Sequence, residues 1–344
     1  MTLSDKTLKL EKFGVAGAGA WGTALAVVAA NGPKGARDVV LWSFEPETVG
    51  HINQSHENTA FLPGVALPHC ILATQNIEDL AACDAVLMVV PAQFARPILK
   101  TLSEVLKPST PIILCSKGIE QSTLMLMSDV AAEYFAPERI AVLSGPSFAA
   151  DVARGFPTAV TLACADNALG HAISKGLGQP SFRPYLSSDI IGTEIGGAIK
   201  NVIAIACGIV EGKKLGESAR AAVTARGFSE MINLGQAIGG HLETMAGLSG
   251  LGDLILTAGS KTSRNFSLGL ALGQGQSVSA VLGARQSVSE GAMSARAVQA
   301  LATKHKVEMP ICAAVDKIIN DGLSVDTAIR DLLDRPFAHE RDED

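Results

Sequence analysis

Aromatic and charged residues are both scarce in this chain of 344 residues. Phe, Trp and Tyr together make up 4% of it, and Asp, Glu, Lys and Arg make up 18%. Hydrophobic residues account for 47%, which excludes an intrinsically disordered chain. With 34 glycines and few bulky rings, the composition predicts closely packed helices in a globular protein of about two domains.

No basic run occurs in the sequence, and the formal net charge is −6. These features exclude a surface for nucleic acid or for an anionic membrane. We identify no apolar stretch as long as a membrane span, so we expect no stable membrane insertion. The N-terminal MTLSDKTLKLEK lacks the apolar core of a signal peptide, so we expect a cytoplasmic protein, with a solvated acidic tail at 337–344.

Several catalytic and metal-binding signatures are also missing. The six cysteines form no C-x-x-C pair, and the seven histidines form no H-E-x-x-H. There is no G-x-S-x-G nucleophile elbow either. We therefore expect free thiols, no metal, and a mechanism other than that of a serine hydrolase.

The stretch FGVAGAGAWGTALAVVAA at 13–30 is the most informative in the chain. It predicts a strand at Phe13–Ala16, a turn with the pattern G-x-G-x-x-G, and a helix that continues to Ala30. Gly17 permits the tight turn, Gly19 allows the backbone to approach a pyrophosphate, and Gly22 allows close packing of helix on strand. Free N–H groups at the helix start favour phosphate binding, so we predict a dinucleotide site here.

A second strand is predicted at Val39–Trp42, and an acidic residue follows it at Glu45. In a dinucleotide fold an acid at this place binds the adenosine ribose hydroxyls. The alternative is that Glu45 and Pro46 simply begin the next helix. No Lys or Arg occurs between Arg37 and Arg96, so a cation for a 2′-phosphate is missing, which favours NAD over NADP.

The remaining pattern predicts a doubly wound, mostly parallel α/β domain up to residue 187 and an all-helical domain over 188–336. Further strands are expected at 85–90, 111–115, 140–143, 158–163 and 182–185, with helices at 93–106 and 124–135. Residues 51–75 are interpreted as a loop, because turn-forming residues are frequent there. Helices of the second domain are expected at 189–211, 218–239, 263–273, 277–283, 290–304, 311–320 and 324–333.

The long helix over 189–211 contains adjacent glycines, Gly196 and Gly197, just before Lys200 and Asn201. A glycine inside a helix costs about 1 kcal/mol, so a pair indicates that another group approaches this backbone closely. Burial in such a place lowers the pKa of a lysine, which can then act as a base. The alternative for Lys200 is a surface lysine on a helix bent by its glycines.

Two short motifs in the second half add polar groups to this hypothesis. GLSGLGDL at 247–254 has one charge, Asp253, which either orients a catalytic lysine or caps the next helix. Thr257 lies one turn later, on the same face. The run Ser263, Arg264, Asn265 begins a helix and combines N–H groups, a guanidinium and an amide, which suits a phosphate.

Further candidates come from the ends of the predicted strands. Lys117 follows one strand, where ligands bind in open α/β folds. Gly145 and Ser147 begin a helix at the same edge of the sheet. Glu290, in SVSEG, is either the acid of a helix start or a ribose contact.

Taken together, these motifs resemble those of the bacterial NAD(P)-dependent glycerol-3-phosphate dehydrogenase family. The similarity covers nearly the whole chain and is carried by GAGAWGTALA at 17–26, NTAFLPG at 58–64, VVPAQ at 89–93, SKGIE at 116–120, LSGPSFA at 143–149, GGAIKNVIAIACGI at 196–209, ARGFSEM at 225–231, GLSGLGDLILT at 247–257, SRN at 263–265 and SEG at 289–291.

This resemblance implies a Rossmann-like domain, a helical substrate domain, and reversible interconversion of sn-glycerol 3-phosphate and dihydroxyacetone phosphate for glycerophospholipid synthesis. It implies that Lys200 is the proton acceptor. Carried over by position, the substrate contacts are Lys117, Gly145, Ser147, Asp253, Ser263, Arg264 and Asn265. The cofactor positions are Ala20, Trp21, Phe44, Lys117, Ala149, Arg264, Val288 and Glu290. The partners expected are this phosphorylated substrate and, in a homodimer, a second copy of the chain.

Some positions depart from the family pattern. The connection PKGARD at 33–38 is longer than usual, and Phe44 replaces a polar or basic residue, which again favours NAD. A different two-domain dehydrogenase, acting on a hydroxy acid or ketopantoate, is the enzymatic alternative. A dinucleotide-sensing protein without turnover is the alternative from another class.

Overall fold

The computed structural model describes residues 9–33, 35, 37–283 and 289–336. The chain divides into two compact units. The first unit comprises the residues up to Ala198 together with Gly235–Leu256, and the second comprises Ile199–Leu234 and the residues from Thr257 onwards. Three helices, α7 (Ile190–Gly212), α8 (Glu217–Ala237) and α10 (Asp253–Ala258), contribute residues to both units.

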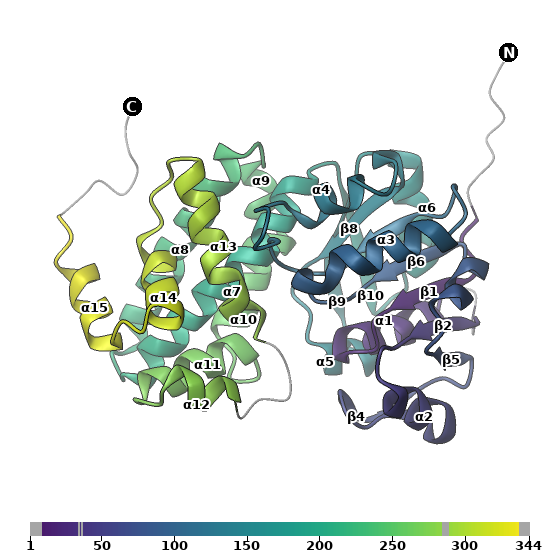
Figure 1. The fold of residues 1–344 in the computed structure, drawn as a ribbon, viewed down its shortest axis with the longest axis horizontal. Coiled ribbons are helices and arrows are strands. Elements are labelled where there is room, and N and C mark those ends of the chain that lie inside the picture. The colour runs from purple at the N-terminus through teal and green to yellow at the C-terminus, as the bar shows by residue number, and fades with distance from the viewer. Residues whose placement is uncertain (1–8, 34, 36, 284–288, 337–344) are drawn as a thin grey trace, which may run out of the picture. The chain divides into compact units, whose positions relative to one another are not determined.

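An eight-stranded sheet forms the centre of the first unit, in the order β10-β9-β8-β7-β6-β1-β2-β5 (Figure 1). Every neighbouring pair is parallel except β8 and β9, which confirms the expected mostly parallel sheet. The strands are β1 (Phe13–Ala16), β2 (Val39–Trp42), β5 (Ile71–Thr74), β6 (Ala85–Met88), β7 (Ile112–Leu114), β8 (Ile140–Ser144), β9 (Thr158–Cys164) and β10 (Phe182–Ser187).

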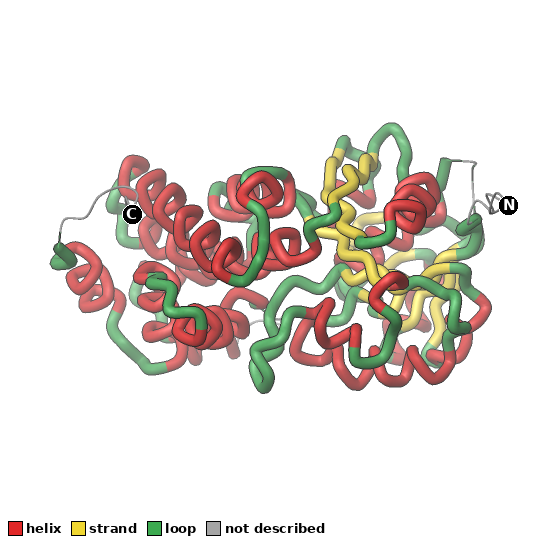
Figure 2. The backbone as a smooth tube through the Cα atoms, turned by 90° about the horizontal axis from the view of Figure 1, so that it is seen from above, coloured by secondary structure: helices red, strands yellow, loops and turns green. Residues whose placement is uncertain are grey.

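Both faces of this sheet are covered by helices, which explains the continuous apolar runs of its inner strands. In β6, Leu87 belongs to one hydrophobic cluster, with Leu25 of α1 (Ala20–Ala30) and Ile173 of α6 (Asn167–Leu177). Its neighbour Val86 belongs to the other, with Leu99 of α3 (Ala95–Val105) and residues of α4 (Met127–Ala132). The first unit is therefore a doubly wound, Rossmann-like domain. Figure 2 shows its strands in yellow between red helices.

Residues 51–75 are not a loop, and this prediction from the sequence is wrong. They contain the second half of α2 (Pro46–Ser55), a hairpin of β3 (Glu57–Asn58) and β4 (Leu62–Ala66), and β5 at the edge of the large sheet. In β5, Leu72 is exposed and Thr74 is only partly buried. Turn-forming residues are also frequent on either side of the strand, so its apolar signal in the sequence is short. Other short elements of the unit are α5 (Ala149–Ala153), α9 (Leu242–Met245), and 3-10 turns at Ile77–Ala82, Ala92–Phe94 and Pro137–Arg139.

The second unit contains only helices among the residues described. They are the later parts of α7 and most of α8, then the end of α10 (Asp253–Ala258), α11 (Arg264–Gly273), α12 (Val278–Gly283), α13 (Glu290–Lys304), α14 (Pro310–Asn320) and α15 (Val325–Leu333). The π-helical turn Leu248–Gly252, which leads into α10, belongs to the first unit. The boundary expected at residue 187 coincides with the end of β10, whereas the compact units divide within α7.

Helix α7 corrects one expectation from the sequence. At 23 residues it is long and apolar enough to span a membrane, although we identified no such stretch. Its glycines and its single lysine broke the apolar run in the sequence. In the structure 89% of its most apolar window is buried inside the protein, as expected for the central helix of a core.

Within the second unit, glycines allow α7 and α11 to pack backbone against backbone. A Cβ added at Gly208 would lie 2.1 Å from the carbonyl oxygen of Phe266, and one at Gly212 would lie 2.4 Å from that of Leu270. The contact is mutual, because a Cβ at Gly269 would lie 1.9 Å from the carbonyl oxygen of Ile205. Helices can approach this closely only where side chains are absent, so these glycines determine how closely α11 packs on α7.

Candidate active site

The turn between β1 and α1 has the geometry that its glycines predict. Gly17 has a φ of +118°, which favours glycine, and its N–H donates to the carbonyl of Trp42 at 3.0 Å. A Cβ on Gly22 would lie 1.8 Å from the carbonyl oxygen of Gly17, so this close approach requires glycine. Gly19 is the N-cap of α1 and has open space beside it. The turn therefore presents free backbone N–H groups to a ligand.

Two residues proposed as cofactor contacts, Ala20 and Trp21, are the first residues of α1. The indole Nε1 of Trp21 is buried and has no hydrogen-bond partner among the described residues. A buried donor without a partner costs free energy, so a ligand atom here would satisfy it. Ala149 is the first residue of α5, which packs against α1.

The end of β2 lies at the same edge of the sheet, because Ala16 pairs with Trp42 in register. Phe44 is 79% exposed there. Glu45 is the N-cap residue of α2, and its carboxylate accepts a hydrogen bond of 2.9 Å from the hydroxyl of Ser43. Glu45 thus begins the next helix, as the alternative interpretation expected, and it also places a carboxylate at the strand end.

Lys117 and Asp253 form a buried ion pair in the first unit. The distance from Lys117 Nζ to Asp253 Oδ2 is 2.6 Å, and the exposed fractions of the two side chains are 13% and 2%. Lys117 Nζ also donates to the carbonyl of Gly145 at 3.2 Å, and the Ser147 hydroxyl donates to the same carbonyl at 3.0 Å. The structure therefore brings these four predicted residues together at the carboxyl ends of β7 and β8.

The adjacent glycines of α7 face this ion pair and the turn before α10. A Cβ on Gly196 would lie 2.7 Å from the carbonyl oxygen of Ser249. A Cβ on Gly197 would lie 2.8 Å from the Ser144 hydroxyl and 3.4 Å from Lys117 Cγ. The inference that another group approaches this backbone is confirmed, and the groups are the π-helical turn and Lys117.

Lys200 lies in the second unit and is only 7% exposed, so the alternative of a surface lysine is wrong. Its Nζ donates to the hydroxyl oxygen of Thr257 at 2.8 Å, and Thr257 is 4% exposed. Thr257 lies one turn after Asp253 on α10. A buried ammonium needs hydrogen-bond partners, and Thr257 supplies one.

A network of amides joins three helices of the second unit. Asn265, from the first turn of α11, donates through Nδ2 to Asn201 Oδ1 of α7 at 2.9 Å. Its Oδ1 accepts from the N–H of Gly291 at the start of α13, at 3.0 Å. A Cβ on Gly291 would lie 2.6 Å from the carbonyl oxygen of Asn201. Sequence analysis missed this role of Gly291, whose signal is its place in the SEG block.

The start of α11 carries the three residues that were predicted to bind a phosphate. Ser263 is its N-cap, and its hydroxyl accepts from the N–H of Phe266 at 3.2 Å, so a helix begins here as predicted. Arg264 is the first residue of the helix and is exposed. Glu290 is the first residue of α13. Val288, predicted to bind the cofactor, lies outside the described residues.

Two buried carboxylates were not singled out from the sequence. Glu194 of α7 accepts from the N–H and the hydroxyl of Ser128, at 2.9 and 2.5 Å. Glu230 of α8 accepts from the N–H groups of Ile311 and Cys312, at 2.7 and 3.1 Å, and so caps α14. Burial raises the pKa of each to about 7. No pattern in the sequence marks them, because their partners are distant along the chain.

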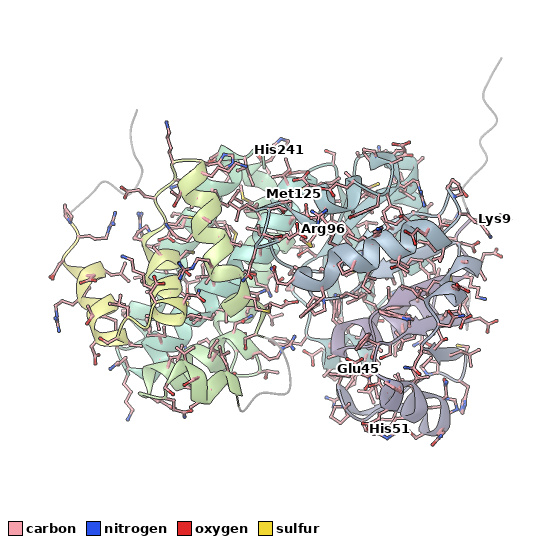
Figure 3. The ribbon with its side chains drawn as sticks, viewed as in Figure 1. Lys9, Glu45, His51, Arg96, Met125 and His241 are labelled. Carbon is pink, nitrogen blue, oxygen red and sulfur yellow. The ribbon has the colours of Figure 1, made fainter. Side chains whose placement is uncertain are left out.

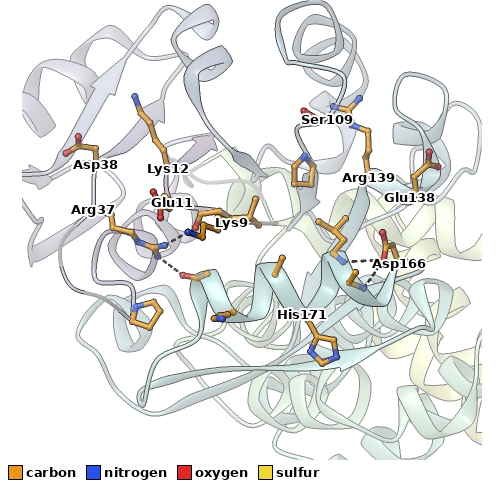
Figure 4. Close-up of a pocket in the computed structure, with 18 residues that line it drawn as sticks. Lys9, Glu11, Lys12, Arg37, Asp38, Ser109, Glu138, Arg139, Asp166 and His171 are labelled. Carbon is orange, nitrogen blue, oxygen red and sulfur yellow. Dashed lines mark hydrogen bonds between the residues drawn. The ribbon is translucent and has the colours of Figure 1, made fainter. Parts of the chain in front are cut away.

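A pocket of about 940 Å³ lies at the opposite edge of the sheet, where the strands begin (Figure 4). Lys12, Asp38, Pro111 and Arg139 border it. Ligands of open α/β folds bind at the carboxyl ends of the strands, so this pocket is separate from the candidate active site. Among the residues described, no three His, Cys, Asp or Glu side chains are arranged to hold a metal ion.

Comparison with known proteins identifies one family over both parts of the chain. The model described as NAD-dependent glycerol-3-phosphate dehydrogenase N-terminus matches residues 12–170, and the model of the C-terminus matches residues 189–330. Glycerol-3-phosphate dehydrogenase [NAD(P)+] of Parvibaculum lavamentivorans is 56% identical over 97% of this chain and 99% of its own. The enzyme of the same name from Maricaulis maris is 56% identical over 96% of this chain and 98% of its own.

A solved structure gives the same result. The crystal structure of glycerol-3-phosphate dehydrogenase from Coxiella burnetii superimposes with a TM-score of 0.90 at 36% identity. The match covers 95% of this chain and 100% of that one. Fold and sequence similarity therefore extend over both units.

Proposed function

The chain belongs to the NAD-dependent glycerol-3-phosphate dehydrogenase family, and from this we propose that it interconverts sn-glycerol 3-phosphate and dihydroxyacetone phosphate. The observation that carries the proposal is a buried lysine, Lys200, hydrogen-bonded to Thr257 on the helix that also bears Asp253. A buried amine with an oriented hydrogen bond suits proton transfer to or from a substrate hydroxyl.

The β1–α1 turn fits a dinucleotide. Gly19 leaves open space, and the start of α1 offers backbone N–H groups. The buried indole N–H of Trp21 has no acceptor among the described residues. Gly17 and Gly22 shape the turn, and Phe44, Ala149, Arg264, Val288 and Glu290 complete the proposed contacts. A bound nicotinamide nucleotide supplies or accepts the hydride, and the protein supplies orientation and proton transfer.

Lys200 acts as the general acid and base. In the oxidation direction its amine takes the proton from the C2 hydroxyl, and in the reduction direction its ammonium returns a proton to that oxygen. Thr257 accepts one N–H of the ammonium and so fixes the direction in which Nζ points. Asn201, the next residue of α7, keeps Asn265 in place through its amide oxygen.

The substrate is held by charge and backbone donors. Arg264, Ser263 and Asn265 at the start of α11 bind its phosphate, where the helix end adds a partial positive charge. Lys117 orients the reacting oxygen, and Asp253 and the Gly145 carbonyl hold Lys117 in place. Ser147 lies beside Gly145 and adds a hydroxyl to this group.

In the cell we expect the product to supply the backbone of glycerophospholipids. We also propose that the chain is cytoplasmic and that it acts as a homodimer. A substrate screen tests the catalytic proposal. We expect steady NADH oxidation with dihydroxyacetone phosphate, and negligible rates with ketopantoate or a 2-oxo acid. Preference for one of those acids indicates the enzymatic alternative, and dinucleotide binding without any turnover indicates a sensor.

A further inference from the structure

The loop that carries Lys117 runs from Ser116 to Leu126 between β7 and α4, and a single backbone bridge, Ile119 with Leu126, closes it. Leu124 within it has a φ of +61°, which is rare for a residue with a side chain. Such a conformation persists only where the surroundings enforce it. The loop closes on itself through the N–H of Leu124, which donates to the carbonyl of Glu120 at 2.8 Å, and it is bound by side chains from the segment after β6, which includes the VVPAQ motif.

Glu120 is the centre of these contacts. It is 6% exposed, and Arg96 from the first turn of α3 holds both of its oxygens, through Nε at 2.9 Å and Nη2 at 2.8 Å. Thr123 donates to Glu120 Oε2 at 2.5 Å. The hydrogen bonds from Arg96 lower the pKa of Glu120, so its carboxylate stays charged at neutral pH. Figure 3 labels Arg96 beside Met125, whose sulfur is 3.7 Å from Arg96 Nη2.

Gln93 binds the loop on either side of Glu120. Its Nε2 donates to the carbonyl of Ile119 at 2.7 Å, and its Oε1 accepts from the N–H of Gln121 at 3.0 Å. The side chain of Gln93 thus satisfies a backbone carbonyl on one side of Glu120 and a backbone N–H on the other. At the start of the loop, the Ser116 hydroxyl donates to the carbonyl of Val90 at 2.5 Å.

We propose that Gln93, Arg96 and Glu120, here called the loop clamp, are positioning residues that set substrate affinity through Lys117. The side chain of Lys117 is held at its far end by Asp253 and the Gly145 carbonyl. The loop clamp holds the backbone at Ile119 and Gln121, just after Lys117. Both the far end of the side chain and this backbone must be fixed for Nζ to meet a substrate oxygen. The inference rests on the substrate role proposed above for Lys117.

The test is Glu120→Gln, which preserves the shape of the side chain and removes its negative charge from the pair with Arg96. Because a misplaced group can cost up to about 10²-fold, we expect KM for dihydroxyacetone phosphate to rise about tenfold. The Kd for NADH should stay within about twofold, because the change acts on substrate orientation alone. An unchanged KM, or parallel losses of substrate and NADH affinity with a lower Tm, overturns the proposal.

The matched control is Glu133→Gln. Glu133 binds the same guanidinium through Nη1, but it follows α4 and does not belong to the Lys117 loop. It should leave KM unchanged. If Glu120→Gln does not fold, Gln93→Met tests the same proposal, because it removes the hydrogen bonds to the backbone of Ile119 and Gln121 without removing a charge. In the double variant Arg96→Gln, Glu120→Gln the ion pair is absent on both sides, so KM should stay high.

Amide hydrogen exchange separates failure of this inference from failure of the proposed function. Faster exchange over residues 117–125 in Glu120→Gln, and not in Glu133→Gln, supports the clamp whether or not the enzyme uses dihydroxyacetone phosphate. Equal exchange in both variants overturns it. Absence of turnover by the unaltered protein refutes only the catalytic proposal.

Discussion

Lys200 donates a 2.8 Å hydrogen bond to the hydroxyl of Thr257, and both residues are almost fully buried. An apolar residue in place of either one would remove this hydrogen bond from a buried polar group. The contact therefore fixes the amine in one direction, which a proton donor needs before its substrate arrives. This hydrogen bond and the burial distinguish Lys200 from the lysines at the surface of the protein.

The first prediction concerns this amine. Lys200→Ala should lower kcat by about 10²- to 10⁴-fold, the usual contribution of a proton-transfer group. The Kd for NADH should not change, because the nucleotide turn lies at β1. Steady-state rates and NADH fluorescence titration measure the two quantities. Lys213→Ala, which removes a partly exposed lysine just after α7, is the control. Equal losses of kcat and NADH affinity would make Lys200 a binding residue only.

The second prediction concerns the ion pair of Lys117. Asp253→Asn leaves the ammonium without its counter-charge, and breaking a buried pair costs about 3 kcal/mol. We expect a lower Tm and a higher KM for dihydroxyacetone phosphate. Asp326→Asn is the matched control, because Asp326 is 71% exposed in its pair with Lys213. A Tm equal to that of the control would contradict the structure.

The third prediction is a preference for NADH over NADPH. Glu45 places a carboxylate at the end of β2, and Arg37 is engaged at the opposite edge with the carbonyls of Leu10, Ala29 and Gly176. We expect kcat/KM to favour NADH by about tenfold, a difference of about 1.4 kcal/mol in transition-state binding.

The variant Phe44→Arg should reduce this preference, because it places a guanidinium where a 2′-phosphate would lie. Phe156→Arg, at another exposed phenylalanine, should leave the ratio of the two kcat/KM values unchanged. Initial rates with both nucleotides at saturating dihydroxyacetone phosphate give the ratio. Faster turnover with NADPH by the unaltered protein would show that Glu45 does not select the nucleotide.

The fourth prediction is a dependence of stability on pH. Glu194 and Glu230 have pKa values raised by burial to about 7, against 4.5 for an ordinary Glu. Between these values the folded state binds more protons than the unfolded state, so the free energy of unfolding falls as pH rises. Each group contributes a loss of about 3 kcal/mol between pH 4.5 and 7.

Glu194→Gln and Glu230→Gln should each flatten the decline of Tm between pH 5 and pH 8. The exposed Glu308→Gln serves as the control. Calorimetry at a series of pH values measures the slope. A slope that stays the same in both variants would show that these carboxylates do not carry the effect.

The fifth prediction concerns the backbone contact of α7 with α11. Gly208→Ala puts a methyl group 2.1 Å from the Phe266 carbonyl oxygen, so one helix must move. We expect a loss of about 1–3 kcal/mol in stability and a raised KM for dihydroxyacetone phosphate, since α11 begins with Arg264. Gly50→Ala, in open space within α2, should instead stabilise the protein by about 0.5–1 kcal/mol. Equal effects of the two changes would contradict the contact.

Much of the fold follows from local pattern. Phe13–Ala16, Val39–Trp42 and the helix Glu290–Lys304 have the predicted bounds, because apolar runs and helix-start residues mark their ends. The strand β5 was missed, since an edge strand of four residues with alternate exposure has too weak a signal. Local sequence pattern thus identifies buried helices and strands better than strands at the edge of a sheet.

The site was only partly predictable. The Ser263 cap and the close approach at Gly196 follow from neighbouring residues. The ion pair between Asp253 and Lys117 does not, because the two residues are 136 positions apart in the chain. Such pairs are set by tertiary packing, which no local periodicity encodes.

The burial of α7 has a consequence for the synthesis of the chain. This helix ends at Gly212, whereas α11, which covers its glycines, begins at Arg264. On the ribosome, a nascent chain that has released α7 but not α11 exposes a long apolar helix to solvent. At that stage the polypeptide resembles a membrane segment, and the exposed apolar surface is prone to aggregation until the later helices are complete.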